Sequence, residues 1–305
     1  MTSRIRCAEE TRARGEALLG TASTVRRWLL VEQPGAWGYD ALGSSELPAE
    51  VAEPLVASAR AAGARVLLVR RPGRRARPRV RRVVLAYSGP EGPWLREASL
   101  AGVDELARLD VGAAFGAAGE GFGQVQDEPA FLVCTHGKHD PCCADFGRPL
   151  VRGLVASGVG GVWESSHLGG DRFAGNLVCL PHGLYFGQVE PEEGEAVVAA
   201  YRAGEIVLER YRGRSCYPMV LQAAEILVRR ELGLRGIDDV VPVAGGRRRL
   251  GPGDDEVALR LADEGPPLVA RVRTAPDPTP RLLTCRGAES HPPTYELVSL
   301  TESRD

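Results

Sequence analysis

The sequence predicts an α/β protein of two domains followed by a small β-rich C-terminal appendage, and three observations support this. The chain has 305 residues, which is more than one ordinary domain contains. Short apolar segments typical of strands alternate with segments of helical spacing. A Gly- and Ala-rich stretch at residues 112–127 separates two such series. We therefore predict domains at residues 1–125, 126–235 and 236–305.

The first domain is expected to contain three helices and four strands. Their predicted positions, in order, are a helix at 8–22, a strand at 25–32, a helix at 48–62, strands at 65–70, 81–87 and 94–100, and a helix at 102–109. Gly63 is the expected C-terminal stop of the second helix. The basic run at 70–82 is interpreted as a solvated hairpin turn and not as a site for an acidic partner or a nucleic acid.

The second domain is expected to be thioredoxin-like. Its predicted elements are a strand at 130–134, a helix at 142–156, a strand at 161–164, a hairpin of strands at 176–180 and 184–189, and helices at 193–203 and 219–232. The order strand, helix, strand, hairpin, helix is that of a thioredoxin-like module. The tail from residue 236 onward has short alternating stretches at 257–261 and 268–272, which predict a small β appendage.

Composition excludes some classes of partner. The net charge is only -2, so no strong field attracts nucleic acid or an anionic membrane. The basic residues are 37 Arg and a single Lys, Lys138, a bias that indicates a bacterium with a GC-rich genome. The first ten residues include acidic side chains, and no apolar run reaches about 18 residues. We therefore expect a cytoplasmic protein with no membrane span.

Four residues predict a metal site. Cys134 ends a predicted strand and Cys143 opens a predicted helix, with eight residues between them. A thiolate at a helix N-terminus is stabilised by the helix dipole and is a good ligand. About 24 residues further on, His167 and Asp171 lie four positions apart on a glycine-containing loop. The two pairs are expected to converge at one end of a sheet.

The same residues carry a resemblance to a known family. Residues 20–235 resemble the sucrase/ferredoxin-like family, most clearly in the segments CTHGKHDPCCADFGRPL, VWESSHLGGDRFAGN and LPHGLYFG and in the opening GTASTVRRWLLVEQPGAWGYDAL. The resemblance implies a thioredoxin-like ferredoxin module with a [2Fe-2S] cluster. It also implies that Cys134 and Cys143 are its two thiolate ligands and that His167 is the first histidine of a His-x3-His pair. Asp171 stands where the second histidine is expected, and a carboxylate there would lower the reduction potential.

The fourth ligand has several candidates. Asp171 is favoured because of its position, and the others are Cys142, Cys179 and His182. Loss of the cluster in this chain is a further alternative. Cys179 lies in an apolar strand, where a cysteine usually belongs to the core.

The remaining cysteines and loop histidines are given lesser roles. Cys7, Cys216 and Cys285 have no partner motif and are taken as incidental. His136 and His139 follow the first ligand closely, so they are expected either to donate hydrogen bonds to cluster sulfurs or to face water.

The predicted function is electron transfer to an unknown redox partner protein, and a non-enzymatic carrier is favoured over an enzyme. A zinc site in a binding or regulatory protein, and an interaction protein without any cluster, are the alternatives. A dithiol oxidoreductase is disfavoured because no Cys-x-x-Cys motif is present. No carboxylate pair is singled out, so sucrose hydrolysis is not predicted. The sequence does not indicate whether the protein is a monomer or an oligomer.

Overall fold

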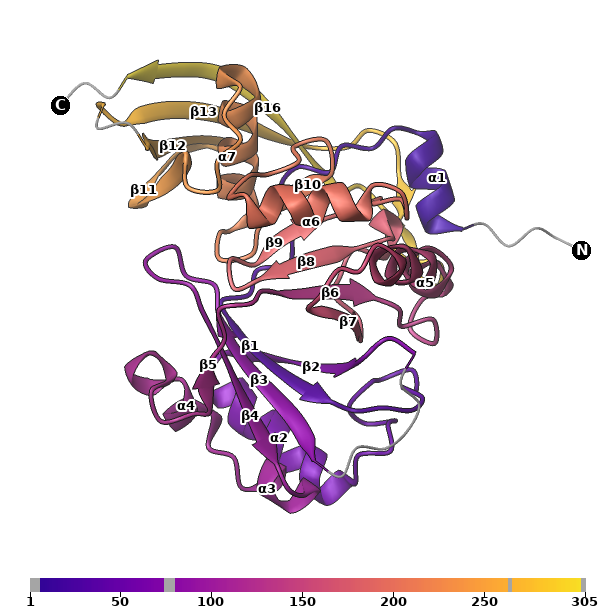
Figure 1. The fold of residues 1–305 in the computed structure, drawn as a ribbon. Helices are drawn as coiled ribbons and strands as arrows, with labels where there is room; N and C mark the ends of the chain where they lie inside the picture. The colour runs from indigo at the N-terminus through magenta and orange to yellow at the C-terminus, as the bar shows by residue number, and fades with distance from the viewer. Residues whose placement is uncertain (1–5, 74–79, 263–264, 303–305) are drawn as a thin grey trace, which may run out of the picture.

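The computed structural model describes residues 6–73, 80–262 and 265–302. Figure 1 shows a mixed α/β fold with one large curled sheet and a separate small sheet near the C-terminus. The basic run at 70–82 falls partly on residues 74–79, which lie outside the described residues.

The elements largely lie where the sequence predicts them. The helices are α1 (Cys7–Ala13), α2 (Ala49–Ala61), α3 (Val103–Ala107), α4 (Val111–Ala114), α5 (Pro141–Ala156), α6 (Gly194–Arg202) and α7 (Met219–Leu232), with 3-10 turns η1 (Gly116–Gly119) and η2 (Asp171–Phe173). The strands of the large sheet are β1 (Arg27–Glu32), β2 (Ala64–Arg70), β3 (Arg81–Tyr87), β4 (Trp94–Leu100), β5 (Gln124–Val125), β6 (Ala130–Cys134), β7 (Val162–Ser165), β8 (Leu177–Leu180), β9 (Leu184–Phe186) and β10 (Tyr211–Arg214). The helix predicted at 8–22 is wrong in length, because Gly15 adopts a φ of +61° just after the helix and the left-handed conformation ends it.

The large sheet contains the same order of elements twice. Its strand order is β10-β9-β8-β6-β7-β2-β1-β3-β4-β5, in which only the β1–β2 and β6–β7 pairs are parallel. A strand, a helix, a parallel strand and a hairpin occur first in residues 27–100 and again in residues 130–186, here called the first and second sheet halves. The halves meet where β2 and β7 pair antiparallel, with Val69 opposite Ser165 and Arg70 opposite Glu164. The predicted border at residues 125 and 126 thus lies between two parts of one continuous sheet, and the domain division stays a prediction.

The curled sheet encloses an inner core that both halves share. In β1, Trp28 and Leu30 point into this core, whereas Leu29 and Val31 point to the opposite face, as the two-residue period of a strand requires. The second sheet half contributes side chains from β6 to β9 and from the loop after β7, which are Ala130, Leu132, Cys134, Trp163, Leu168, Val178, Leu180 and Tyr185. Cys134 therefore ends its strand at the edge of a buried, apolar interior.

Helices cover the outer faces of the sheet. The helices α2, α3 and α4 pack on the first sheet half, with Leu55 of α2 fully buried. The helices α5 and α6 pack on the second, where Leu150 and Leu154 contact Phe131 of β6. Among the described residues, none of these helices is both long and apolar enough to traverse a bilayer.

The C-terminal appendage is β-rich, as predicted. The strands β11 (Val240–Gly251), β12 (Asp254–Leu261), β13 (Leu268–Pro276) and β16 (Pro293–Glu302) form an antiparallel sheet that packs on α7. A short hairpin of β14 (Arg281–Leu282) and β15 (Glu289–Ser290) interrupts it. Figure 1 shows these C-terminal loops, in yellow, beside α1 and α5, and α1 contacts β14. The N-terminal helix α1 and the β14–β15 hairpin therefore meet next to the start of α5.

Candidate metal centre

The turn between β6 and α5 positions two cysteines. Asp140 is the N-cap of α5, and its Oδ1 accepts a hydrogen bond of 2.9 Å from the Cys142 backbone N–H. Pro141 follows at the first helical position, where a missing N–H is tolerated. These residues fix the helix start, so Cys143 faces the inner core beside Cys134.

The second loop follows β7 and carries His167 and Asp171. Gly169 and Gly170 have φ values of +99° and +77°, so the backbone turns sharply there. A Cβ on Gly170 would lie within 2.3 Å of a guanidinium nitrogen of Arg212, so this close approach requires glycine.

Side chains from other elements hold this loop by hydrogen bonds to its backbone carbonyls. The bonds are Arg65 to the carbonyl of residue 167 at 2.7 Å, Tyr185 to that of 168 at 3.2 Å, and Arg212 to that of 169 at 3.1 Å. Arg212 also donates to Asn176 Oδ1 at 2.6 Å, and Asn176 in turn donates to the carbonyl of Gly170 at 2.8 Å. These hydrogen bonds fix the backbone of the second loop, which carries His167 and Asp171.

The structure brings all four predicted site residues together. The ligand atoms of Cys134, Cys143 and His167 lie within 4.8 Å of one another. Cys143 Sγ is 3.1 Å from Asp171 Oδ1, and His167 Nδ1 is 3.0 Å from the same oxygen. Two thiols, an imidazole and a carboxylate thus share one site at the carboxyl ends of β6 and β7, where ligands of α/β sheets commonly bind.

His139 is a further member that the sequence interpretation did not include among ligands. Its Nε2 lies 3.8 Å from Asp171 Oδ2, and its ring centroid is 3.8 Å from that of His167. A hydrogen bond of 3.1 Å from the His139 N–H to the carbonyl of His136 closes a turn that returns His139 toward Cys134. The signal available in the sequence was its place in the loop between the two cysteines.

The other candidates for a fourth ligand lie elsewhere in the described structure. Cys142 points away from Cys143, toward Cys7 and Cys285. Cys179 is fully buried in the apolar core between the second sheet half and the helices α5 and α6, as predicted for an apolar strand. His182 Nδ1 is hydrogen-bonded to the hydroxyl of Tyr201 at 2.7 Å. Asp171 and His139 remain as the candidates within reach of the site.

The charges of the site are coupled. Contact with Cys143 and with His167 lowers the pKa of Cys134, whereas a thiolate on Cys134 raises the pKa of Cys143. Burial lowers the pKa of His167, but its contacts with Asp171 and Cys134 outweigh burial and raise the pKa to about 9. A metal cation that binds through a nitrogen of His167 has to displace any proton on that nitrogen.

The site reaches solvent through its histidine edge. The side chains of His139 and His167 are each 28% exposed, whereas Asp171 is 2% exposed. A cavity of about 280 Å³ opens over this edge, with Tyr39 stacked on His139 at a centroid distance of 5.6 Å. The thiols lie deepest, and the imidazoles face outward.

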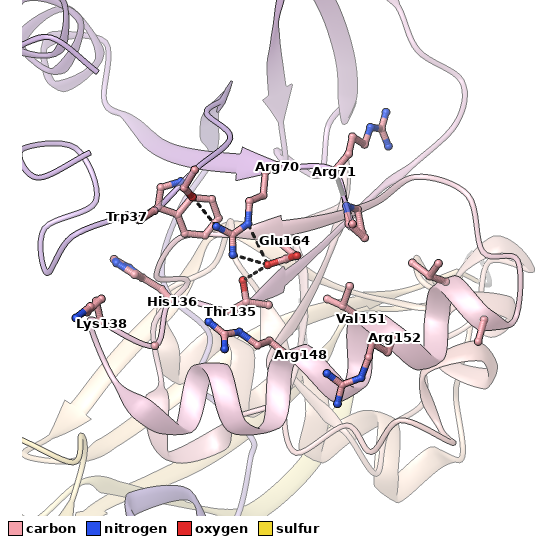
Figure 2. A pocket seen from close by; sticks show the side chains of 17 residues that line it. Trp37, Arg70, Arg71, Thr135, His136, Lys138, Arg148, Val151, Arg152 and Glu164 are labelled. Atoms are coloured by element: carbon pink, nitrogen blue, oxygen red, sulfur yellow. Dashed lines mark hydrogen bonds and ion pairs between the residues drawn. The ribbon is translucent and has the colours of Figure 1, made fainter. Parts of the chain in front are cut away.

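A cationic pocket lies on the other side of the turn that follows Cys134. Figure 2 shows Arg70 bonded to Glu164, which also accepts a hydrogen bond from Thr135. The pocket has a volume of about 1010 Å³, and the exposed cations Lys138, Arg148 and Arg152 line it. Arg148 therefore belongs to this pocket, and Arg172, the residue after Asp171, is paired with Glu16 at 2.9 Å.

A mixed α/β fold with thiols, imidazoles and a carboxylate converging at one end of its inner core defines a candidate metal-binding protein. The chain belongs to the sucrase/ferredoxin-like family, whose model matches residues 18–213, almost two-thirds of its 305 residues. No curated protein and no solved structure matched the chain. The family match includes both sheet halves and the candidate metal centre, and it excludes α1 and the C-terminal appendage.

Proposed function

We propose that the chain is an electron carrier that binds a [2Fe-2S] cluster through Cys134, Cys143, His167 and Asp171. The observation that carries the proposal is the meeting of two buried thiols and an imidazole from separate loops. Such a cluster, when bound, takes up and releases single electrons. The chain's own residues would hold it, exclude water from its thiolate side and leave its histidine side near the surface.

The donor set supports metal binding at this place. His167 Nδ1 is buried and lies 3.0 Å from the carboxylate of Asp171, so an imidazole and a carboxylate present ligand atoms next to the two thiols. Thiolate and imidazole are also the donors that iron–sulfur clusters accept.

The arrangement of the second sheet half supports the ferredoxin proposal. Its order of β6, α5, β7, the β8–β9 hairpin and α6 is the order expected of a thioredoxin-like module. Cys134 and Cys143 occupy the end of its first strand and the first turn of its first helix.

We propose that a redox partner protein docks over the histidine edge. His139 and His167 are the site residues with exposed surface, and Tyr39, which is 59% exposed, extends that surface. A partner there approaches the site more closely than it could through the inner core.

The test is metal and sulfide analysis of protein purified without oxygen. We expect about two irons and two sulfides per chain and a paramagnetic signal after reduction. Cys143→Ser should lose both, whereas Cys216→Ser, at a buried thiol outside the site, should keep both. A colourless wild type that takes up no iron during reconstitution would refute the proposal.

Variants at the second loop identify the fourth ligand. If Asp171 is a ligand, Asp171→His should retain the cluster and raise its reduction potential, because a neutral imidazole replaces an anionic carboxylate. His139→Gln should then leave the cluster in place. If His139→Gln loses the cluster and Asp171→Asn keeps it, His139 is the fourth ligand instead. Cluster binding only in Asp171→His would show that the natural chain has lost it.

A structural zinc site is the second candidate function, and one observation favours it. The ligand atoms of Cys134, Cys143 and His167 all lie within 4.8 Å, a spacing that suits one tetrahedral ion. A cluster separates the ligands of its two irons more widely. Zinc without sulfide that is lost in Cys143→Ser and kept in Cys216→Ser would select this alternative.

A further inference from the structure

A second group of metal-type side chains lies beside the candidate centre and shares no residue with it. Cys7 begins α1, Cys142 is in the first turn of α5, and Cys285 lies between β14 and β15. Their ligand atoms and the carboxylate of Asp140 all lie within 4.8 Å of one another. The sequence interpretation treats Cys7 and Cys285 as incidental, because neither has a partner motif, and the two lie 278 positions apart.

The three sulfurs form a nearly regular triangle. Cys142 Sγ is 3.4 Å from Cys285 Sγ and 3.8 Å from Cys7 Sγ, and Cys285 Sγ is 3.5 Å from Cys7 Sγ. A tetrahedral Zn²⁺ with bonds of about 2.3 Å to sulfur separates its thiolates by about 3.8 Å. A disulfide would require about 2.05 Å between two sulfurs. The triangle thus has the size of one face of a zinc tetrahedron.

Asp140 provides the fourth side chain. Its carboxylate oxygens are 3.9 and 4.0 Å from Cys7 Sγ. One oxygen accepts the N–H of Cys142 at 2.9 Å and the other accepts the N–H of Cys285 at 2.6 Å, so lone pairs on both oxygens are still available. The carboxylate therefore connects two of the three thiol-bearing segments and faces the third.

The surroundings are those of a closed structural site. Asp140, Cys7 and Cys142 are fully buried, and Cys285 is partly exposed. Ala8 and Ala174 pack against the thiols, and the backbone N–H of Cys7 lies 3.4 Å from Cys285 Sγ, a contact that stabilises thiolate sulfur. Structural zinc sites are typically four-coordinate and have no open position.

We propose that Cys7, Cys142, Cys285 and Asp140 bind one structural zinc ion that fastens α1 and the β14–β15 hairpin to the start of α5. The proposal is independent of the function proposed above, since it uses none of the same ligands. It has a consequence for that site, because Cys142 and Cys143 are adjacent. The ion would fix the helix turn from which Cys143 faces the inner core, and three segments distant in sequence would be joined at one point.

The test uses the full-length chain with the first centre removed by Cys134→Ser and His167→Gln. This background protein should bind one zinc per chain. Cobalt in its place should give the visible bands of a tetrahedral ion and intense thiolate charge-transfer absorption. Adding Cys7→Ser or Cys285→Ser should weaken zinc binding at least tenfold, whereas adding Cys216→Ser should not change it. No stoichiometric zinc, or unchanged affinity in the Cys7 and Cys285 variants, would overturn the proposal.

A measurement on the wild-type chain covers the case in which a variant fails to fold. Zinc should protect Cys7, Cys142 and Cys285 from alkylation, and a chelator should expose all three together. A disulfide between Cys142 and Cys285 in freshly isolated, zinc-supplied protein would refute the zinc site. Asp140→Asn retains the N-cap, so at least tenfold weaker zinc binding in that variant would confirm the carboxylate as a ligand. Unchanged binding would remove it from the set.

Discussion

Gly147 offers a way to move one candidate ligand without changing any ligand. It lies one helical turn after Cys143 on the same face of α5. A Cβ at this position would be 1.9 Å from the carbonyl oxygen of Cys134, and ordinary contact begins at 3.4 Å, so Gly147→Ala requires a displacement of about 1.5 Å. The position of the Cβ is fixed by the helix backbone, and the oxygen of Cys134 is a backbone atom, so no side-chain rotation relieves the contact. Because metal geometry tolerates only about 0.5 Å, we expect the affinity for metal to fall at least tenfold.

The matched control is Gly153→Ala, further along the same helix. A Cβ there would lie 2.7 Å from the carbonyl oxygen of Pro191. This requires a shift of about 0.7 Å, at a place that does not contact the candidate ligands. Overpacking destabilises by about 1–3 kcal/mol, and alanine returns up to about 1 kcal/mol through helix propensity. Urea unfolding should therefore show both variants destabilised, and metal titration should show only Gly147→Ala impaired. Unaltered metal binding in Gly147→Ala would refute the reasoning.

Three further predictions concern the groups that support the site and the fold. Arg212→Lys should destabilise the chain by about 3 kcal/mol in urea unfolding and weaken metal binding, because one ammonium cannot replace the several hydrogen bonds to the second loop; wild-type metal affinity in that variant would contradict this role. Arg229→Met should cost about 3–5 kcal/mol, because it leaves the fully buried Glu225 without its charge partner, and Arg229→Met/Glu225→Leu should recover most of the loss; no recovery would refute the pairing argument. Burial lowers the pKa of His182 from 6.5 to about 4, so the unfolded chain gains a proton before the folded one, and stability should fall by up to about 3 kcal/mol between pH 6.5 and pH 4. His182→Asn, which can still bond to Tyr201, should show a smaller acid loss in unfolding measured at both pH values.

The local elements were predictable from sequence because their signals are local. The helix α7 and the strands β3, β4 and β6 have the predicted bounds, each marked by apolar periodicity and by breakers at its ends. The helix at 8–22 was overestimated because its spacing continues past Gly15, whose left-handed conformation stops it.

The arrangement of those elements was less predictable. The antiparallel pairing of β2 with β7 joins segments about 95 residues apart through only two residue pairs. Neither strand has a sequence feature that indicates this pairing. The four predicted site residues converge because each follows directly on a strand or opens a helix, which sequence can show. The thiols of Cys7, Cys142 and Cys285 meet only through the tertiary fold, so no spacing along the chain could indicate them.

The short join between the sheet halves has a mechanical consequence. The strands β2 and β7 pair through two residue pairs only, but further hydrogen bonds cross the seam beside them, between Leu68 and Ser166 in both directions and from Arg65 to the carbonyl of residue 167. These contacts involve the start of the second loop, which also carries His167. A metal bound to His167 would order this loop, so it would also tighten the join between the two sheet halves, although all its ligands belong to one of them.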